Sequence, residues 1–277
     1  MNKPKVSVCI PIYNGERFVE ETIRSVLNQT YTDYELLICD NKSTDHTIEK
    51  INGFTDERIR LIQNAENVGM VGNWNICLKE AKGEYIKLLC ADDLIAPDCL
   101  KKQVELLESD DSIVLAFNAS YVIDETGKVV LKRRRFRKNK VINGKKYAKK
   151  SFHKGNMYGE PSNMLFRKDK SAEAGNFKDD LCYSPDWEYW MRLSLLGNVG
   201  YIDNYLMSFR VAATSTTSNL LKKLDVLVQD DKLLLRHMRE NEIFKMTKGD
   251  AFIHSLVMRL RLYAKVVFLK LVIKKEK

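Results

Sequence analysis

The chain has 277 residues, of which 44% are hydrophobic and 30% are charged, and its formal net charge is +9. This amount of apolar surface excludes an intrinsically disordered chain and is enough for one large domain with a smaller addition. The six cysteines form no Cys-x-x-Cys pair, which argues against a zinc ribbon or a redox motif. No pattern typical of a signal peptide precedes the first apolar run, so we expect a cytoplasmic protein.

Short apolar runs alternate with helical patterns in the first part of the chain. The runs typical of buried strands are 6–10, 36–39, 59–62 and 85–89. Apolar residues recur at helical spacing over 18–27 and 74–81, and capping residues at 43–45 predict a short helix. This alternation predicts an α/β fold in which parallel strands carry helices on both faces. Ligands of such sheets bind at the carboxyl ends of the strands, where Pro11, Asp40 and Asp92 stand.

The second part of the chain is less regular than the first. Its predicted elements are a strand, a turn and a strand at 113–123, 125–127 and 128–131, another strand at 163–166, and helices at 187–195 and beyond 219. We therefore expect the first part to supply the ligand-binding strand ends.

Two adjacent carboxylates, Asp92 and Asp93, follow the fourth strand pattern. A nucleoside diphosphate that leaves a sugar carries concentrated negative charge, which a divalent cation stabilises. Mg²⁺ and Mn²⁺ prefer carboxylate oxygens, usually one or two together with the phosphates of the substrate. The alternative is that the pair simply lies on a solvated loop, where Asp-Asp pairs are common.

Six short motifs occur in an order and spacing that is specific. They are VSVCIPIYN at 6–14, SVLNQTY at 25–31, DNKSTD at 40–45, NVG at 67–69, KGEYI at 82–86, and ADD at 91–93 followed by Pro97. Together they resemble glycosyltransferase family 2 over roughly residues 5 to 210. The resemblance implies an inverting enzyme with a GT-A fold, that is, a Rossmann-like, mostly parallel sheet flanked by helices. It also implies a domain over 1–215, with a nucleotide-sugar half at about 1–110 and an acceptor half at about 111–215, and leaves 216–277 as a basic helical C-terminal extension.

The resemblance also implies roles for individual residues of the donor site. Pro11 and Tyr13 would line the nucleobase pocket, and Asp40 would hydrogen-bond the base. Asp92 and Asp93 would contact the ribose and the metal-bound diphosphate, and the rest of the nucleotide-sugar site would comprise Asn14, Asn67 and Gly69. Two alternatives stay open, in which Tyr13 packs on the sheet and Asp40 caps the loop at 41–45.

The family resemblance places the general base in the segment SPDWEYWMR at 184–192. Direct displacement at the anomeric carbon needs a carboxylate that activates the acceptor hydroxyl, and Asp186 matches that base. Pro185 replaces the usual Glu. Asp186 has the alternative role of a helix N-cap, and Glu188 that of a capping or supporting carboxylate. The side chains of Trp187 and Trp190 have helical spacing, so they either stack on sugar or belong to the core.

Two positions depart from the family pattern. Cys90 stands where an acid often precedes the Asp pair, and Ala212 stands where a His often follows the last core strand. We therefore expect a weakly bound Mn²⁺ or Mg²⁺, held by Asp92 or Asp93 with phosphate and water.

Two segments carry most of the positive charge. Residues 132–150 contain eleven Lys or Arg and no acid, and residues 251–277 contain seven with one Glu. These segments either are solvated or meet an anionic membrane surface or the phosphates of a lipid-linked acceptor. Burying the charges of 251–273 at the bilayer centre would cost about 2.5–3.5 kcal/mol each, which argues against a transmembrane helix. This helix would instead lie at a membrane interface, or pack on the catalytic domain or a second subunit.

The predicted function is transfer of a sugar, from a UDP-sugar by preference, to a hydroxyl of a glycan or lipid-linked acceptor in cell-surface polysaccharide synthesis. The predicted location is cytoplasmic, at the inner face of the cell membrane. A non-catalytic sugar-nucleotide-binding module is the alternative. A sugar nucleotidyltransferase is disfavoured because the loop after the first strand has a single Gly, and nucleic-acid binding because one aromatic, Phe136, gives no stacking platform.

Overall fold

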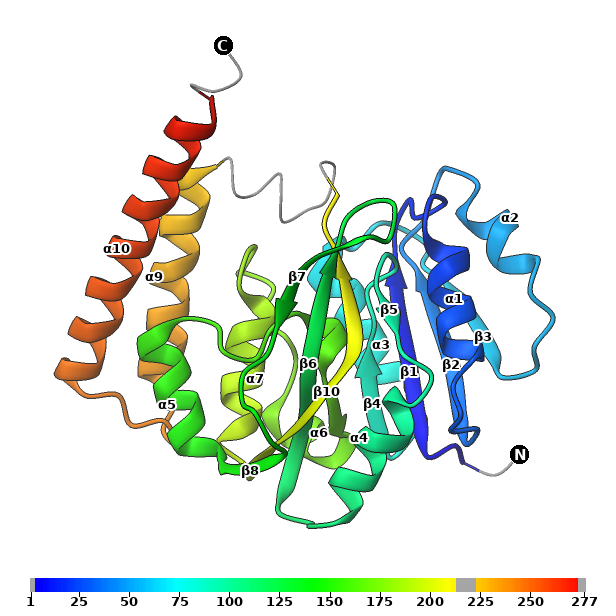
Figure 1. The fold of residues 1–277 in the computed structure, drawn as a ribbon, viewed down its shortest axis with the longest axis horizontal. Helices are drawn as coiled ribbons and strands as arrows, with labels where there is room; N and C mark the ends of the chain where they lie inside the picture. The colour runs from blue at the N-terminus through cyan, green and yellow to red at the C-terminus, as the bar shows by residue number, and fades with distance from the viewer. Residues whose placement is uncertain (1–2, 213–222, 274–277) are drawn as a thin grey trace.

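The computed structural model describes residues 3–212 and 223–273, with side chains described as far as residue 261. The elements of the donor half are β1 (Val6–Ile12), α1 (Val19–Leu27), β2 (Tyr34–Asp40), α2 (Thr47–Asn52), β3 (Ile59–Gln63), α3 (Gly69–Glu80) and β4 (Tyr85–Leu88). Each strand and helix predicted from the sequence in this half is confirmed (Figure 1).

The following part of the chain adds six more strands to the same sheet, together with helices that pack on it. Its elements are β5 (Leu94–Ile95), α4 (Cys99–Glu108), β6 (Ile113–Ile123), β7 (Val129–Arg133), β8 (Lys140–Asn143), α5 (Gly144–Lys154), a 3₁₀ turn (Pro161–Asn163), β9 (Leu165–Arg167), α6 (Lys168–Ala174), α7 (Pro185–Ser194) and β10 (Asn198–Arg210). The strand predicted at 163–166 starts later, because the 3₁₀ turn takes up its first residue.

The sheet has the order β3-β2-β1-β4-β9-β6-β10-β5, with β7 beside β6 and β8 beside β10. The first four strands are parallel to one another, as predicted. Farther along the sheet, β9 runs antiparallel to both β4 and β6, whereas β6 and β10 are parallel. The donor half is therefore a parallel sheet and the second half is mixed.

Helices cover both faces of the sheet, and each face has its own apolar core. Because successive side chains of a strand point to opposite faces, Val8 and Ile10 of β1 enter the core under α1, α2 and α4. Cys9 of the same strand enters the core under α3, α5 and α7. This burial on both faces explains why the first strands are continuous apolar runs.

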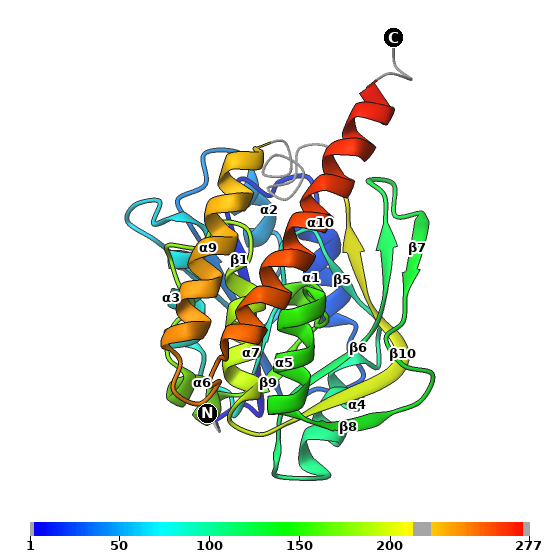
Figure 2. The ribbon, with the colours of Figure 1, turned by 90° about the vertical axis from the view of Figure 1, so that its left-hand side faces the viewer.

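The C-terminal extension forms two helices, α9 (Leu224–Glu240) and α10 (Lys248–Ile273). Figure 2 shows the two helices side by side against α5 and α7. The predicted boundary between 215 and 216 falls outside the described residues. In the part of the chain that the structure describes, no helix is long and apolar enough to cross a bilayer.

Candidate active site

The predicted donor residues gather along one edge of the sheet. Because β3, β2, β1 and β4 are parallel neighbours, their carboxyl ends meet at that edge. Asp40 is the last residue of β2, Tyr13 follows β1, and Asp92 lies just beyond β4. The structure thus brings together side chains that are up to about eighty positions apart in the sequence.

The end of β1 offers an exposed aromatic ring next to a buried carboxylate. Tyr13 is 50% exposed, whereas Asp40 is 1% exposed. The backbone N–H of Ser43 donates to the Asp40 carboxylate at 3.1 Å, so Asp40 does cap its own loop. Asn14 has a positive φ of 51° and joins the two loops, since its Oδ1 accepts from the Thr44 N–H at 2.8 Å.

Asn67 and Gly69 shape the loop between β3 and α3. The Asn67 Oδ1 accepts from the Asn41 Nδ2 at 2.8 Å and from the Gly69 N–H at 2.9 Å. Gly69 has a φ of +77°, a conformation that favours glycine, and its carbonyl also accepts from Asn41. These two residues therefore hold the loop at the site edge through Asn41, which is itself buried.

Asp92 and Asp93 are adjacent but differ in their surroundings. Asp93 is fully buried, and its two oxygens accept from the hydroxyl of Ser162 and from the backbone N–H of Arg210. Asp92 is partly exposed. Burial raises the pKa of both carboxyls, and for Asp93 the charge of Asp92 raises it further. Asp92 is the member of the pair that is open to a ligand.

Arg210 fixes the loop that carries this pair. Its side chain is 1% exposed, and its Nε donates to the Asp92 carbonyl at 2.9 Å. One terminal nitrogen donates to Glu21 of α1 at 2.6 Å, and the guanidinium lies 4.4 Å from the centre of the Phe18 ring. The last strand in the sequence, β10, therefore sets the position of the loop after β4.

Cys90 marks the place where the two halves of the site meet. Burial raises the pKa of its thiol well above the usual range, and the negative charges of Asp93, Asp92 and Asp186 raise it further. The charges of the Asp pair after β4 and of the acid of α7 thus act on the same thiol. The acid that the family often carries at this position would add a further charge here.

Asp186 lies in the first turn of α7, with Ser184 as the N-cap residue. Burial raises its pKa to about 7, although nearby backbone N–H groups oppose that change. The side chain is only partly buried by its surroundings, so a solute can reach it. A carboxylate that exchanges its proton near neutral pH is suited to general base catalysis.

The other polar and aromatic residues of α7 face away from the site. Trp187 and Trp190 are 6% and 0% exposed, and the Trp187 Nε1 donates to Ser151 at 2.9 Å. Glu188 is 2% exposed and accepts two hydrogen bonds from Arg192, at 2.9 and 2.8 Å. Both tryptophans are therefore core residues, and Glu188 pairs within its own helix.

The residues at the site fit a divalent cation that is held partly by substrate. Among the described side chains, no group of three or more His, Cys, Asp or Glu could hold a metal ion alone. The open carboxylate of Asp92 supplies one hard oxygen ligand, and phosphate oxygens and water complete such shells. Ala212, at the position expected for a His, is buried and adds no ligand.

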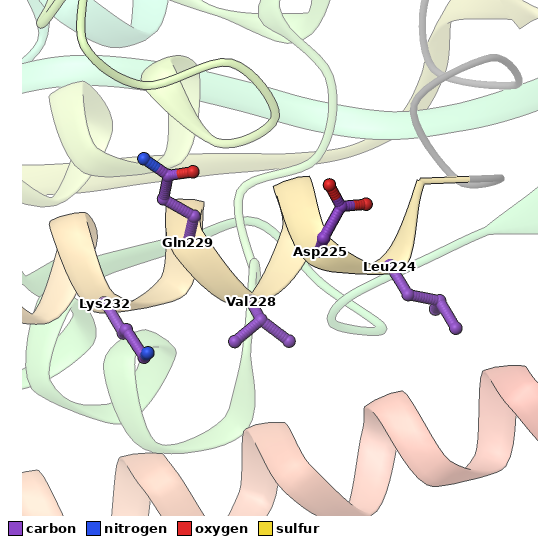
Figure 3. Close-up of a pocket in the computed structure, with 5 residues that line it drawn as sticks. All are labelled: Leu224, Asp225, Val228, Gln229 and Lys232. Carbon is purple, nitrogen blue, oxygen red and sulfur yellow. The ribbon is translucent and has the colours of Figure 1, made fainter.

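A hollow elsewhere on the surface is not part of this site. It has a volume of about 430 Å³ and is lined by Leu224, Asp225, Val228, Gln229 and Lys232 of α9 (Figure 3). None of the predicted donor residues lines it.

Sequence reasoning did not single out Ser162 or Arg210, although both hold Asp93. Ser162 also accepts from the Cys90 N–H at 2.9 Å, and its carbonyl accepts from the buried Lys87 at 2.9 Å. A Ser after a Pro gives no signal of this kind in a sequence. Arg210, a charged residue at the end of an apolar strand, is the one signal that the sequence did contain.

The chain matches a protein-family model and several named relatives. The model of glycosyl transferase family 2 matches residues 7–174. An uncharacterised glycosyltransferase of Methanocaldococcus jannaschii is 32% identical over 228 residues, which make up 80% of this chain and 76% of that protein. The UDP-Glc:alpha-D-GlcNAc-diphosphoundecaprenol beta-1,3-glucosyltransferase WfgD of Escherichia coli is 40% identical over 102 residues, 37% of this chain and 40% of that protein.

Solved structures show the same architecture. Residues 1–349 of TarS from S. aureus, in complex with UDP-GlcNAc, superpose with a TM-score of 0.72 at 16% identity, over 92% of this chain and 71% of that one. The mannosyltransferase PcManGT of Pyrobaculum calidifontis, in complex with GDP-Man and Mn²⁺, gives 0.67 at 20% identity, over 99% and 76%. These likenesses confirm the predicted GT-A fold. With the family match and the named relatives, they show that the chain is a glycosyltransferase and belongs to glycosyltransferase family 2.

Proposed function

We propose that this glycosyltransferase transfers a sugar from a UDP-sugar to a hydroxyl of a lipid-linked glycan, with inversion at the anomeric carbon. The observation that carries the proposal is the placement of Tyr13, Asp40 and Asp92 at one edge of the sheet, together with the partly exposed carboxylate Asp186, whose pKa burial raises to about 7. A general base for the acceptor hydroxyl and a site for the leaving diphosphate are the two elements that a direct displacement needs. Among relatives, WfgD is named for a UDP-Glc donor and a diphosphoundecaprenol acceptor, which supports this choice of substrates.

The residues of this chain divide the reaction between them. The exposed ring of Tyr13 stacks on the nucleobase beside Pro11, and Asp40 accepts a ring N–H of uracil with an oxygen lone pair that its loop leaves over. Asn14, Asn67 and Gly69 hold the loops that close the donor pocket.

Asp186 then takes the proton of the acceptor hydroxyl while the oxygen of that hydroxyl attacks the anomeric carbon. The bond from that carbon to the diphosphate oxygen breaks in the same step, so the configuration inverts. Asp92 would hold a divalent cation beside the diphosphate, and Asp93 positions the loop through Ser162 and Arg210. When bound, the cation supplies Lewis-acid stabilisation of the charge on the leaving diphosphate.

A thermal-shift comparison tests the donor. At about 100 times Kd, a UDP-sugar with Mn²⁺ stabilises the protein by about 2.7 kcal/mol, or about 5–10 °C in Tm. We expect UDP-glucose or UDP-N-acetylglucosamine to give this shift, GDP-mannose to give little, and excess chelator to reduce it. A shift with GDP-mannose alone would contradict the UDP preference, and no shift with any of the three would contradict the donor site.

Strand β7 and the basic run at 132–138 carry exposed apolar and basic residues that suit a membrane surface. Val129, Val130 and Leu131 of β7 are 44–58% exposed, next to the basic run at 132–138. Figures 1 and 2 show the tip of the β6–β7 hairpin and the C-terminal end of α10 toward the same end of the molecule. A lipid-linked acceptor in an anionic leaflet would be met by this face.

A charge-neutralising variant tests the membrane contact. Replacing the exposed residues Arg135, Arg137 and Lys138 by Gln removes about 1 kcal/mol per charge near an anionic surface, so binding to vesicles with anionic lipid falls by up to about 100-fold. The matched control replaces three exposed lysines elsewhere, namely Lys79, Lys101 and Lys178. Vesicle sedimentation measures both variants. Equal losses in the two would mean that only net charge matters and that this face has no special role.

A further inference from the structure

The C-terminal helices are docked firmly on the catalytic body. Leu234 and Met238 of α9 are 1% and 0% exposed and belong to the core under α3, α5 and α7. His254 of α10 is fully buried, with its Nδ1 2.7 Å from the Phe152 carbonyl and its Nε2 2.9 Å from Asp231 of α9. These contacts therefore fix the positions of α9 and α10 relative to α5 and α7.

Asp230 of α9 reaches from this extension to the loop in front of α7. Its side chain is 3% exposed, and its Oδ1 accepts from the backbone N–H groups of Cys182, at 2.6 Å, and Tyr183, at 3.0 Å. Its Oδ2 accepts from the hydroxyl of Ser184. One carboxylate thus takes three donors from three consecutive residues, which suits the acceptor-only chemistry of an ionised Asp.

Ser184 shows that this contact replaces an ordinary helix cap. A Ser at the N-cap usually accepts a hydrogen bond from the first turn of its own helix. Ser184 is the N-cap of α7, yet its side chain makes no such bond and donates to Asp230 instead. The start of α7 is therefore held from outside by α9. Asp186 lies two residues farther on, in the first turn of the same helix.

We propose that Asp230 is a positioning residue for the reaction, through which the C-terminal extension holds the 182–184 loop and so places the Asp186 carboxylate at the site. The inference rests on the proposed function, in which Asp186 is the general base. Burial is the main cause of the raised pKa of Asp186, and the charge of Asp230 raises it further. Asp230 therefore affects both the position of the base and its protonation. The charge of Asp186 in turn raises the pKa of Tyr183 in the loop and that of the Cys90 thiol.

Three variants of the full chain separate the contributions. Asp230→Ala removes both the loop contacts and the charge, and Asp230→Asn keeps a carbonyl oxygen for the two backbone N–H groups but removes the charge. Asp231→Asn is the matched control, because it weakens the neighbouring contact to His254 and thus the docking of the helices, without touching the loop. Each is compared with the wild type in hydrogen exchange, kinetics and pH profile.

We expect Asp230→Ala to speed amide hydrogen exchange of Cys182 and Tyr183 at least about tenfold, and to lower kcat about 10–100-fold. The KM for the donor should change by less than about threefold, since the donor residues lie on other loops. The acid limb of kcat/KM should move to lower pH in both Asp230 variants. In Asp231→Asn, exchange of the loop, kcat and the acid limb should match those of the wild type.

Equal exchange of the loop in Asp230→Ala and Asp231→Asn would overturn the proposal, and so would a faster loop with unchanged kcat and acid limb. Hydrogen exchange does not depend on turnover, so it also separates this inference from the proposed function. If the wild type transfers no sugar, the general-base role fails, and with it the catalytic part of the proposal. The anchoring of the loop by Asp230 is then still decided by the exchange rates.

Discussion

Asp186→Asn will lower kcat for sugar transfer by about 10²–10⁴-fold, because the amide cannot take the proton of the acceptor hydroxyl. Binding of the UDP-sugar will stay within about threefold, since the donor residues lie at the ends of β1, β2 and β4. The measurement is steady-state transfer together with donor titration by calorimetry. Unchanged activity in this variant would leave the non-catalytic binding module, or another base, as the explanation.

The pH dependence of the wild type gives a second readout of the same carboxylate. The base acts when it is deprotonated, so kcat/KM should rise with pH and level off above a pKa of about 7. The folded-state pKa exceeds that of the unfolded chain, so the folded state binds more protons between pH of about 4 and 7. The stability contributed by this group is therefore complete below about pH 4 and is lost as pH rises through about 7.

Asp186→Asn removes this loss, so at pH 8 its Tm should exceed that of the wild type by up to about 10 °C. The difference should shrink as the pH falls, because the protonated acid and the amide are both neutral. A role as a helix cap alone would have the opposite sign, since removing a charge that a helix N-terminus favours lowers Tm. Differential scanning calorimetry at pH 5 and pH 8 separates these outcomes.

Asp92→Ala and Asp93→Ala will affect different properties although the residues are adjacent: the first will lower activity and the second will lower Tm. Asp92→Ala removes the open carboxylate that we propose as the ligand of the cation beside the diphosphate, so kcat/KM should fall about 10²–10³-fold. Its Tm should stay near that of the wild type, because Arg210 binds the backbone carbonyl of Asp92 and not its side chain. The Mn²⁺-dependent part of donor binding should disappear with it.

Asp93→Ala leaves two buried donors, the Ser162 hydroxyl and the Arg210 N–H, without their partner. Each unsatisfied group costs about 1–3 kcal/mol, so Tm should fall by about 5 °C or more. At low temperature the folded fraction should keep most of its Mn²⁺-dependent donor binding. Loss of metal dependence in Asp93→Ala with retention in Asp92→Ala would reverse the assignment of the two residues.

Local patterns in the sequence determined the donor half of the fold. Apolar runs such as 6–10 and 36–39 can be buried only on both faces of a parallel sheet, which places Asp40 and Asp92 at one edge without further information. The predicted strands at 113–123 and 128–131 are confirmed as the antiparallel pair β6 and β7, because a turn with Gly127 joins them directly. Periodicity and turn residues act over a few positions, so a sequence reports them well.

The tertiary structure alone decided which member of each candidate set is open to a ligand. The sequence gives Asp92 and Asp93 the same chemistry, and only the arrival of Ser162 and Arg210 from distant segments buries one of them. Trp187 and Trp190 could likewise be assigned to the core only when the helices that cover them were in place. The position of a polar side chain depends on partners from elsewhere in the chain, which no local pattern records.

The general-base segment shows the same division between what local motifs record and what distant contacts decide. The segment at 184–192 and its resemblance to the family identified Asp186 from the sequence. Its pKa of about 7 comes from burial, and its loop is held by Asp230 from a helix more than forty residues away. The sequence by itself thus determined the family and the strand ends, and it supplied a candidate for the base, because these rest on short motifs and local periodicity. Only the packed chain decided the protonation and placement of that base, because both depend on what surrounds the carboxylate.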